Sequence, residues 1–163
     1  MAGTPPRGVA RLVHLAVGGF LTSRPGRTLH LALDRATGGR ILPSVRGLAT
    51  IVLMTTGRRT GRRIAAPLSA LVHGPAWVVI ASNGGRERPP QWLLNLRAEP
   101  RATVRAGRRT LEVVAREAGP DEHAALWPRI VERYAGYETY RARTSREIPL
   151  VLLEPAADPA RAR

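Results

Sequence analysis

The chain of 163 residues contains no cysteine and no lysine, and it is poor in aromatic side chains. The absence of cysteine excludes disulfide bonds and thiolate metal sites. The four histidines are scattered without the spacing of metal ligands, so no metal centre is expected. No apolar stretch reaches the length of a membrane-spanning helix. No Gly-x-Gly-x-x-Gly motif occurs, which argues against a dinucleotide-binding fold.

All 26 basic residues are arginine, and with 12 acidic residues they give a net charge of +14. A charge of this size is typical of proteins that bind nucleic acid or anionic membranes. A set of arginines without lysine, in a chain rich in alanine, indicates instead a codon bias of the whole genome. An aromatic content of 4% also leaves few rings for stacking on bases. We therefore expect no nucleic-acid partner.

The length suits one domain with flanking segments. We expect residues 1–45 to form a helical N-terminal extension, because apolar residues recur at helical spacing over residues 8–22 and a second short helix is predicted over residues 28–36. Packing over the core is the favoured role of the extension; partial disorder and a peripheral membrane contact are the alternatives. Residues 46–155 form the main domain, and residues 156–163 form a flexible tail. The expected location is the cytoplasm, with membrane association if the extension binds lipid.

The main domain is predicted to contain six strands and at least two helices. Apolar runs bounded by turn residues predict strands at 50–55, 64–72, 77–81, 101–106, 110–117 and 148–153, and periodicity predicts helices at 91–98 and 121–134. Pro67 indicates that the second strand lies at an edge or carries a bulge. Short connections favour mostly antiparallel pairing, so the predicted fold class is α+β, with a sheet closed into a small barrel and peripheral helices.

The segment TTGRRTGRR, residues 55–63, contains four arginines and two glycines directly after an apolar run. Glycines let a loop turn back and expose its amide groups, and arginines supply forked cationic donors. Together they predict an anion site, most naturally for a phosphate. A second glycine-containing turn, residues 81–85, precedes the helix predicted at 91–98. Two such turns after consecutive strands predict a cofactor that carries phosphate; a solvated hairpin tip is the alternative.

Six motifs occur in a consistent order: TTGRRTG at 55–61, PL at 67–68, VIASxGG at 79–85, WxxNLxAxP at 92–100, YxxY at 137–140 and IPxVxxEP at 148–155. Over residues 48–155 this set resembles the deazaflavin-dependent nitroreductases, actinobacterial split β-barrel proteins that use coenzyme F420. The resemblance implies an FMN-binding-like split β-barrel and a reductase, in which reduced F420 donates a hydride to a quinone, a nitroaromatic or an activated enone. An FMN-dependent reductase and a non-catalytic barrel that binds F420 or a lipid-like ligand are the alternatives, and a homodimer is left open.

The resemblance also implies which residues contact the cofactor and the substrate. The cofactor's phosphate-bearing tail would meet Arg58, Arg59 and Thr60, and its ring would lie along residues 64–69. The complete implied cofactor-binding set is Arg58, Arg59, Thr60, Ile64, Ala65, Ala66, Pro67, Leu68, Ser69, Ile80, Ala81, Ser82, Asn83, Gln91, Trp92, Leu93, Leu94, Asn95 and Tyr137. The substrate would lie against Ser69, Tyr134, Tyr137 and Tyr140, with Tyr134, Tyr137 and Ser82 orienting it or donating a proton.

The residues themselves leave structural alternatives for part of this set. Trp92 could be a core side chain, with a flat apolar face toward the cofactor as the functional reading. The three tyrosines could form a packing stripe on a helix. His123 is expected to be an exposed helix residue.

Three positions depart from the family pattern. Asn83 stands where family members usually carry a lysine, and Ser69 stands where the nitroreductase members have an aromatic residue, which implies a roomier pocket. Ile64 stands where an arginine is frequent, and Arg63, one position earlier, is expected to point to the other face of the strand.

Overall fold

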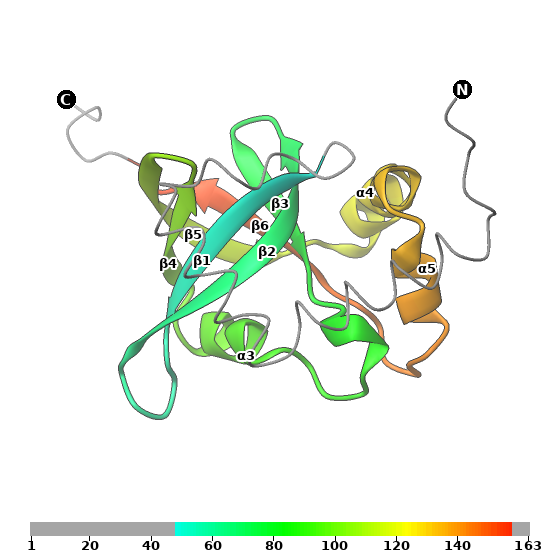
Figure 1. The fold of residues 1–163 in the computed structure, drawn as a ribbon, viewed down its shortest axis with the longest axis horizontal. Coiled ribbons are helices and arrows are strands. Elements are labelled where there is room, and N and C mark those ends of the chain that lie inside the picture. Colours follow the sequence, from blue (N-terminus) through cyan, green and yellow to red (C-terminus); the bar gives the residue numbers. More distant parts are fainter. Residues whose placement is uncertain (1–47, 158–163) are drawn as a thin grey trace, which may run out of the picture.

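The structure, a computed structural model, describes residues 48–157. In this part of the chain, six antiparallel strands form a closed barrel in the order β1-β2-β3-β6-β5-β4, with three α-helices around it (Figure 1). The strands are β1 (Ala49–Thr56), β2 (Arg63–His73), β3 (Ala76–Ile80), β4 (Arg101–Ala106), β5 (Arg109–Glu117) and β6 (Leu150–Pro155), and the helices are α3 (Gln91–Ala98), α4 (Pro120–Arg133) and α5 (Gly136–Arg141). The predicted barrel of six mostly antiparallel strands with peripheral helices is confirmed. The predicted extension over residues 1–45 and most of the tail over 156–163 lie outside the described residues, apart from residues 156 and 157.

Strand β2 pairs with β1 and with β3 over different parts of its length. Its first part pairs with β1, from Thr56 opposite Arg63 to Ala49 opposite Ala70. Only its last part, residues 70–73, also pairs with β3. The ladder stops there because β3 ends at Ile80 and the N–H of the next residue, Ala81, donates to the Pro149 carbonyl instead, at 3.0 Å. Among the described residues, 63–69 therefore have a strand on one side only; we call this the open edge of β2.

Pro67 lies in the middle of the open edge, opposite Val52, and the register runs past it without a slip. Proline lacks an N–H group and so fits where one side of a strand has no partner. The prediction of an edge position is confirmed, and there is no bulge.

The barrel interior holds the first core cluster. Alternate residues of the strands point inward, for example Leu53, Val79 and Val104, each with 0% of its surface exposed. Helix α3 completes this cluster with Trp92, Leu93 and Leu96 and closes the lower end of the barrel as drawn in Figure 1. Pro90 stands at the N-cap of α3, where a missing N–H costs nothing, so the helix begins where the sequence predicts it.

A second core cluster lies on the outer face of β3 and β6, under α4 and α5. Val78 and Leu152 point to this face, whereas their neighbours Val79 and Leu153 point into the barrel. Since both faces of these strands are buried, their sequences are continuous apolar runs rather than alternating ones. Within residues 48–157, no helix is long and apolar enough to cross a bilayer.

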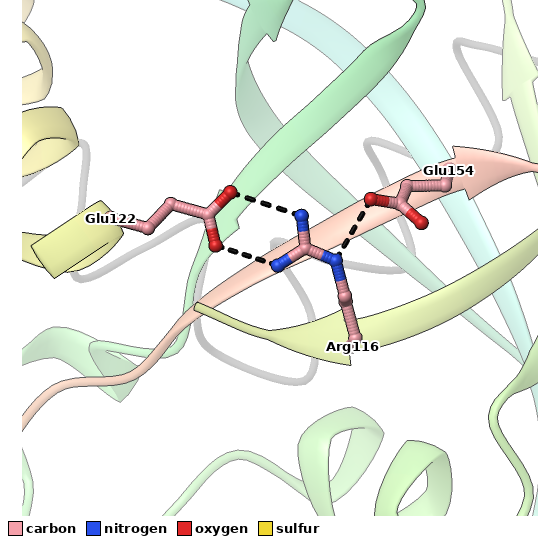
Figure 2. Close-up of polar contacts among 3 residues, drawn as sticks. All are labelled: Arg116, Glu122 and Glu154. Carbon is pink, nitrogen blue, oxygen red and sulfur yellow. Dashed lines mark hydrogen bonds and ion pairs between the residues drawn. The ribbon is translucent and has the colours of Figure 1, made fainter. Parts of the chain in front are cut away.

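Helix α4 is tied to the barrel by an ion cluster (Figure 2). Arg116 of β5 donates from both Nη atoms to Glu122 of α4, at 2.6 and 3.0 Å, and from Nε to Glu154 of β6, at 2.8 Å. The fork matches a carboxylate geometrically, so the cluster fixes the angle at which α4 leaves β5.

His123 of α4 corrects one expectation. Its Nε2 lies 3.0 Å from the Ile148 carbonyl, and its ring stacks on Trp127 with 5.4 Å between ring centroids. It is half-buried and not an exposed helix residue. The carbonyl it meets lies 25 residues away in the sequence, so helical periodicity alone could not indicate the contact.

Candidate functional site

The tip of the β1–β2 hairpin, residues 57–62, is held together by its own backbone. The Gly57 N–H donates to the Arg62 carbonyl at 2.8 Å, and the Gly61 N–H donates to the Gly57 carbonyl at 2.7 Å. The amides of both glycines are therefore used inside the loop and are not offered to an anion. Glycine is needed at these two positions for steric reasons. Gly61 has φ of +65°, which other residues rarely adopt, and a Cβ on Gly57 would lie 2.9 Å from the Ile64 Cδ1.

Arg58 fastens the tip to the start of α3. Its Nη1 donates to the Gln91 Oε1 at 3.0 Å and to the Asn95 Oδ1 at 3.1 Å, and its backbone N–H reaches the same Oδ1 at 3.3 Å. The Asn95 Nδ2 donates to the Thr55 Oγ1 at 3.1 Å. Asn95 and Thr55 are each 1% exposed, so a buried side-chain amide joins helix α3 to the end of strand β1. Asn95 was predicted to contact the cofactor, but these bonds engage both polar atoms of its side chain.

The other arginines of the tip divide into two groups. Arg59 and Arg62 are exposed, and among the described residues their guanidinium groups make no hydrogen bond or ion pair with another side chain. Arg63 turns to the outer face of the barrel, where its Nη2 donates to the Thr103 Oγ1 at 2.5 Å. This is the direction predicted for Arg63. The tip thus presents Arg59, Arg62 and the unbonded part of the Arg58 guanidinium as an exposed cationic surface.

The second predicted turn follows β3 and leads toward α3. Asn83, Gly84 and Gly85 all have positive φ, at 48°, 67° and 79°. The Asn83 Nδ2 donates to the Arg88 carbonyl at 2.7 Å and closes the loop. Ser82 is buried, with 8% of its surface exposed. The hairpin tip, α3 and this turn all lie at the lower end of the molecule in Figure 1.

The three tyrosines come together, although not as one helical stripe. Tyr134 caps the C-terminus of α4, whereas Tyr137 and Tyr140 belong to α5. Their ring centroids lie 5.3 to 6.3 Å apart, and the hydroxyl oxygens of Tyr134 and Tyr140 are 3.4 Å apart. Burial raises the pKa of Tyr137 and of Tyr140 well above the usual range, with the neighbouring phenols adding to the effect. Both phenols are therefore neutral near pH 7 and can donate a hydrogen bond.

Two glycines allow this packing. A Cβ on Gly136 would lie 2.4 Å from the Tyr134 ring, and a Cβ on Gly85 would lie 2.7 Å from the Tyr140 carbonyl oxygen. The turn after β3 and α5 are thus in direct contact.

The predicted cofactor-binding residues separate by burial. Eight of them are buried, with no more than 8% of their surface exposed: Ala66, Ile80, Ala81, Ser82, Trp92, Leu93, Asn95 and Tyr137. The Trp92 ring packs in the barrel interior, so the core reading of this residue holds and little of its face is available to a ligand. The accessible residues are those of the tip, those of the open edge apart from Ala66, and Asn83, Gln91 and Leu94.

The open edge of β2 has the character of a contact surface for a flat apolar group. Ile64 is 37% exposed, Ser69 is exposed, and Ala65, Pro67 and Leu68 are half-exposed. Backbone groups on the side away from β1 meet no strand in the described chain. An apolar strip with unpaired backbone donors and acceptors suits a heteroaromatic ring with polar edges.

A hollow of about 280 Å³ lies on the other side of α3, against β5. It shares Leu93 with the predicted set. The polar side chains around it are already paired, since Arg97 binds Glu117 at 2.7 Å and Arg116 binds Glu122. The hollow therefore offers no unpaired charge to a ligand. No group of three or more potential metal ligands occurs within residues 48–157.

Sequence reasoning missed Arg146, which lies just before β6. Its guanidinium donates to the carbonyls of Ala81 and Ser82, both at 2.9 Å. The partners are 64 and 65 residues apart in the chain, and nothing in the local pattern around Arg146 indicates the contact.

The residues present fit a ligand with an anionic tail and a flat ring. The cationic tip would receive the tail, and the open edge beside it would receive the ring. The two features are adjacent because the tip is the continuation of β1 and β2 themselves.

Comparison with known proteins identifies the family of the chain. Residues 27–155 match the family model described as F420H(2)-dependent quinone reductase. The F420H(2)-dependent quinone reductase of Mycobacterium tuberculosis (strain H37Rv) is 36% identical over 129 residues, which is 77% of this chain and 87% of that protein. A solved F420-H2 dependent reductase is 31% identical with a TM-score of 0.60, over 65% of this chain and 94% of that one. A solved domain-swapped dimer is 28% identical with a TM-score of 0.62, over 78% and 95%.

Proposed function

Because the chain belongs to the F420H2-dependent quinone reductase family, we propose that it transfers a hydride from reduced coenzyme F420 to a quinone. The observation that carries the proposal is that a cationic tip lies next to an open, partly apolar strand edge. The chain matches the family over most of its length. The family uses F420, which favours this cofactor over FMN and favours a reductase over a non-catalytic binding protein.

The chain's own residues hold and orient the cofactor. Arg58, Arg59 and Thr60 bind the phosphate-bearing tail through guanidinium forks and a hydroxyl. The open edge supports the ring, through Ile64, Pro67 and Leu68 by apolar contact and through backbone groups by hydrogen bonds. When bound, reduced F420 supplies the hydride.

The role proposed for Asn95 is positioning. Its side chain holds Arg58 and Thr55 and so keeps the tip in place for the cofactor. Ser82 and Asn83 approach the ring from the turn after β3. Arg59 and Arg62, which are not engaged by other side chains of the described chain, supply the charge that the usual lysine would supply at Asn83.

The tyrosine cluster orients the acceptor. Tyr134 is half-buried and has the most accessible ring of the three, so its Oη is the first candidate to donate a hydrogen bond to a quinone oxygen. Tyr137 and Tyr140 are 8% exposed and keep the Tyr134 ring in place, Tyr137 by edge-to-face packing and Tyr140 through a hydroxyl 3.4 Å from the Tyr134 hydroxyl. Nitroaromatics and activated enones are further acceptors for the same site, because each presents an oxygen to these phenols.

The binding test is titration of the purified protein with F420, followed by tryptophan quenching, and the activity test is oxidation of F420H2 by menadione. A binding response with turnover is expected, and no response at high micromolar F420 would remove the proposal. The double variant R58A/R59A should bind F420 about tenfold or more weakly, from the loss of charge-assisted bonds. The matched control R108A/R109A removes the same charge from the β4–β5 turn at the opposite end of the barrel and should bind as the parent does.

Two further expectations stay predictions. A homodimer is tested by sedimentation of the full chain at several concentrations. Peripheral membrane contact through residues 1–45 is tested by flotation with anionic vesicles, with and without that segment.

A further inference from the structure

The guanidinium group of Arg146 donates hydrogen bonds to four backbone carbonyls. Nη2 donates to Ala81 and Ser82 at 2.9 Å each, Nε donates to Arg86 at 3.0 Å, and Nη1 donates to Glu147 at 3.2 Å. Three of these carbonyls belong to the turn that follows β3. Arginine suits this position because its planar fork presents five donors and no acceptor.

A second charged side chain ties the same two segments in the opposite direction. Glu87, at the end of the turn, accepts from the Ser145 N–H at 2.8 Å and from the Ser145 Oγ at 3.1 Å. The bond from the Ser145 backbone is the main reason why the pKa of Glu87 lies below its usual range. Residues 145–146 and the turn are therefore joined twice, once from each side.

The turn needs such support because its own backbone provides little. Asn83, Gly84 and Gly85 follow one another with positive φ, a conformation with few internal hydrogen bonds. Within the turn, the Gly85 N–H reaches the Ser82 carbonyl at 2.9 Å and the Arg86 N–H reaches the Asn83 carbonyl only at 3.4 Å. A carbonyl without a partner is costly to bury, and Arg146 supplies a donor to the Ala81 carbonyl and a second donor to the Ser82 carbonyl.

We infer that Arg146 is a positioning residue of the cofactor site, which holds the turn carrying Ser82 and Asn83 in its binding geometry before the cofactor arrives. This inference rests on the proposed function, in which that turn contacts F420. A direct role for the Arg146 charge on a phosphate is disfavoured, because Nε, Nη1 and Nη2 all donate to carbonyls.

The experiment measures the turn without cofactor and then its affinity for F420. Amide hydrogen exchange of Gly85 and Arg86 is followed by NMR in the parent, R146M and R146K. Both variants should exchange about tenfold or more faster at these amides and should bind F420 about tenfold more weakly, as expected for loss of hydrogen bonds from a charged donor. The lysine variant keeps the charge but not the fork, so it should not restore either property.

The matched control is R116M, which removes three bonds to carboxylates on β6 and α4 instead of bonds to the turn. It should lower the melting temperature and leave both the Gly85 exchange rate and the F420 affinity unchanged. If R146M does not fold, R146K carries the test alone.

Full rescue of F420 affinity by R146K would mean that charge matters and not the fork, and would overturn the inference. So would parent-like exchange at Gly85 in a folded R146M. Failure of the parent to bind F420 is a separate outcome, because it removes the proposed function and leaves the exchange measurement standing.

Discussion

Replacement of the buried Asn95 by leucine tests how the cationic tip is held. The change keeps the branched shape of the side chain but removes two neutral hydrogen bonds, to the Arg58 N–H and the Thr55 Oγ1, and one bond to the Arg58 guanidinium. At about 1 kcal/mol for each neutral bond and about 2 kcal/mol for the charged one, the loss is about 4 kcal/mol. A chain of this size loses about 2 to 4 °C of melting temperature per kcal/mol, so N95L should melt about 8 to 16 °C lower.

The assay is thermal unfolding by circular dichroism, with Q91M as the matched control. Gln91 offers Arg58 a single acceptor on the exposed surface, so its loss should lower the free energy of unfolding by less than about 1 kcal/mol. N95L should also bind F420 more weakly, because the tip is no longer held against α3. Equal melting temperatures for N95L and Q91M would refute the reasoning, since the buried amide would then contribute no more than the exposed one.

Two other changes probe the tyrosine cluster and the Arg116 cluster. G136A should push the Tyr134 ring from its place, because the new Cβ would lie 2.4 Å from that ring. The KM for a quinone should rise severalfold while the affinity for F420 stays constant. Steady-state kinetics measures the KM, and fluorescence titration measures the F420 affinity. R116M should make the free energy of unfolding depend less on pH in the acidic range. A hydrogen bond from Arg116 holds the pKa of Glu122 below its ordinary value of 4.5, so this pair stabilises the fold above that pH and the contribution is lost as pH falls through the lowered pKa. Melting curves between pH 6 and pH 3 should therefore converge for the parent and R116M, and a constant gap over that range would contradict the assignment.

Local signals predicted the strands because each depends on nearby residues. Gly107, with φ of +57°, places the β4–β5 turn where the sequence predicts it. Pro90 and Pro120 mark the starts of α3 and α4. The β1–β2 hairpin, with Gly57 and Gly61 in its loop, follows from the same short-range rules.

The site was only partly predictable because its geometry depends on distant pairs. The arginine-rich tip was found from its composition, but its anchor, Asn95, lies 37 residues beyond Arg58. Arg146 meets a turn more than 60 residues before it. The glycines of the tip were expected to turn the loop so that it exposes its amides, but the amides of Gly57 and Gly61 themselves close the loop, because composition does not tell which carbonyl an amide will meet. No local pattern distinguishes such an arginine or asparagine from one on the surface.

The open edge of β2 has a consequence for the behaviour of the protein among its own copies. An unpaired strand edge is a template on which another extended chain can add, and this leads to aggregation. Pro67 takes one donor away from the middle of that edge, and Arg62 and Arg63 at its start repel the same edge of a second molecule. Within the described residues, like charges and a proline therefore protect this edge from pairing with the same edge of another copy, and they do so without covering it.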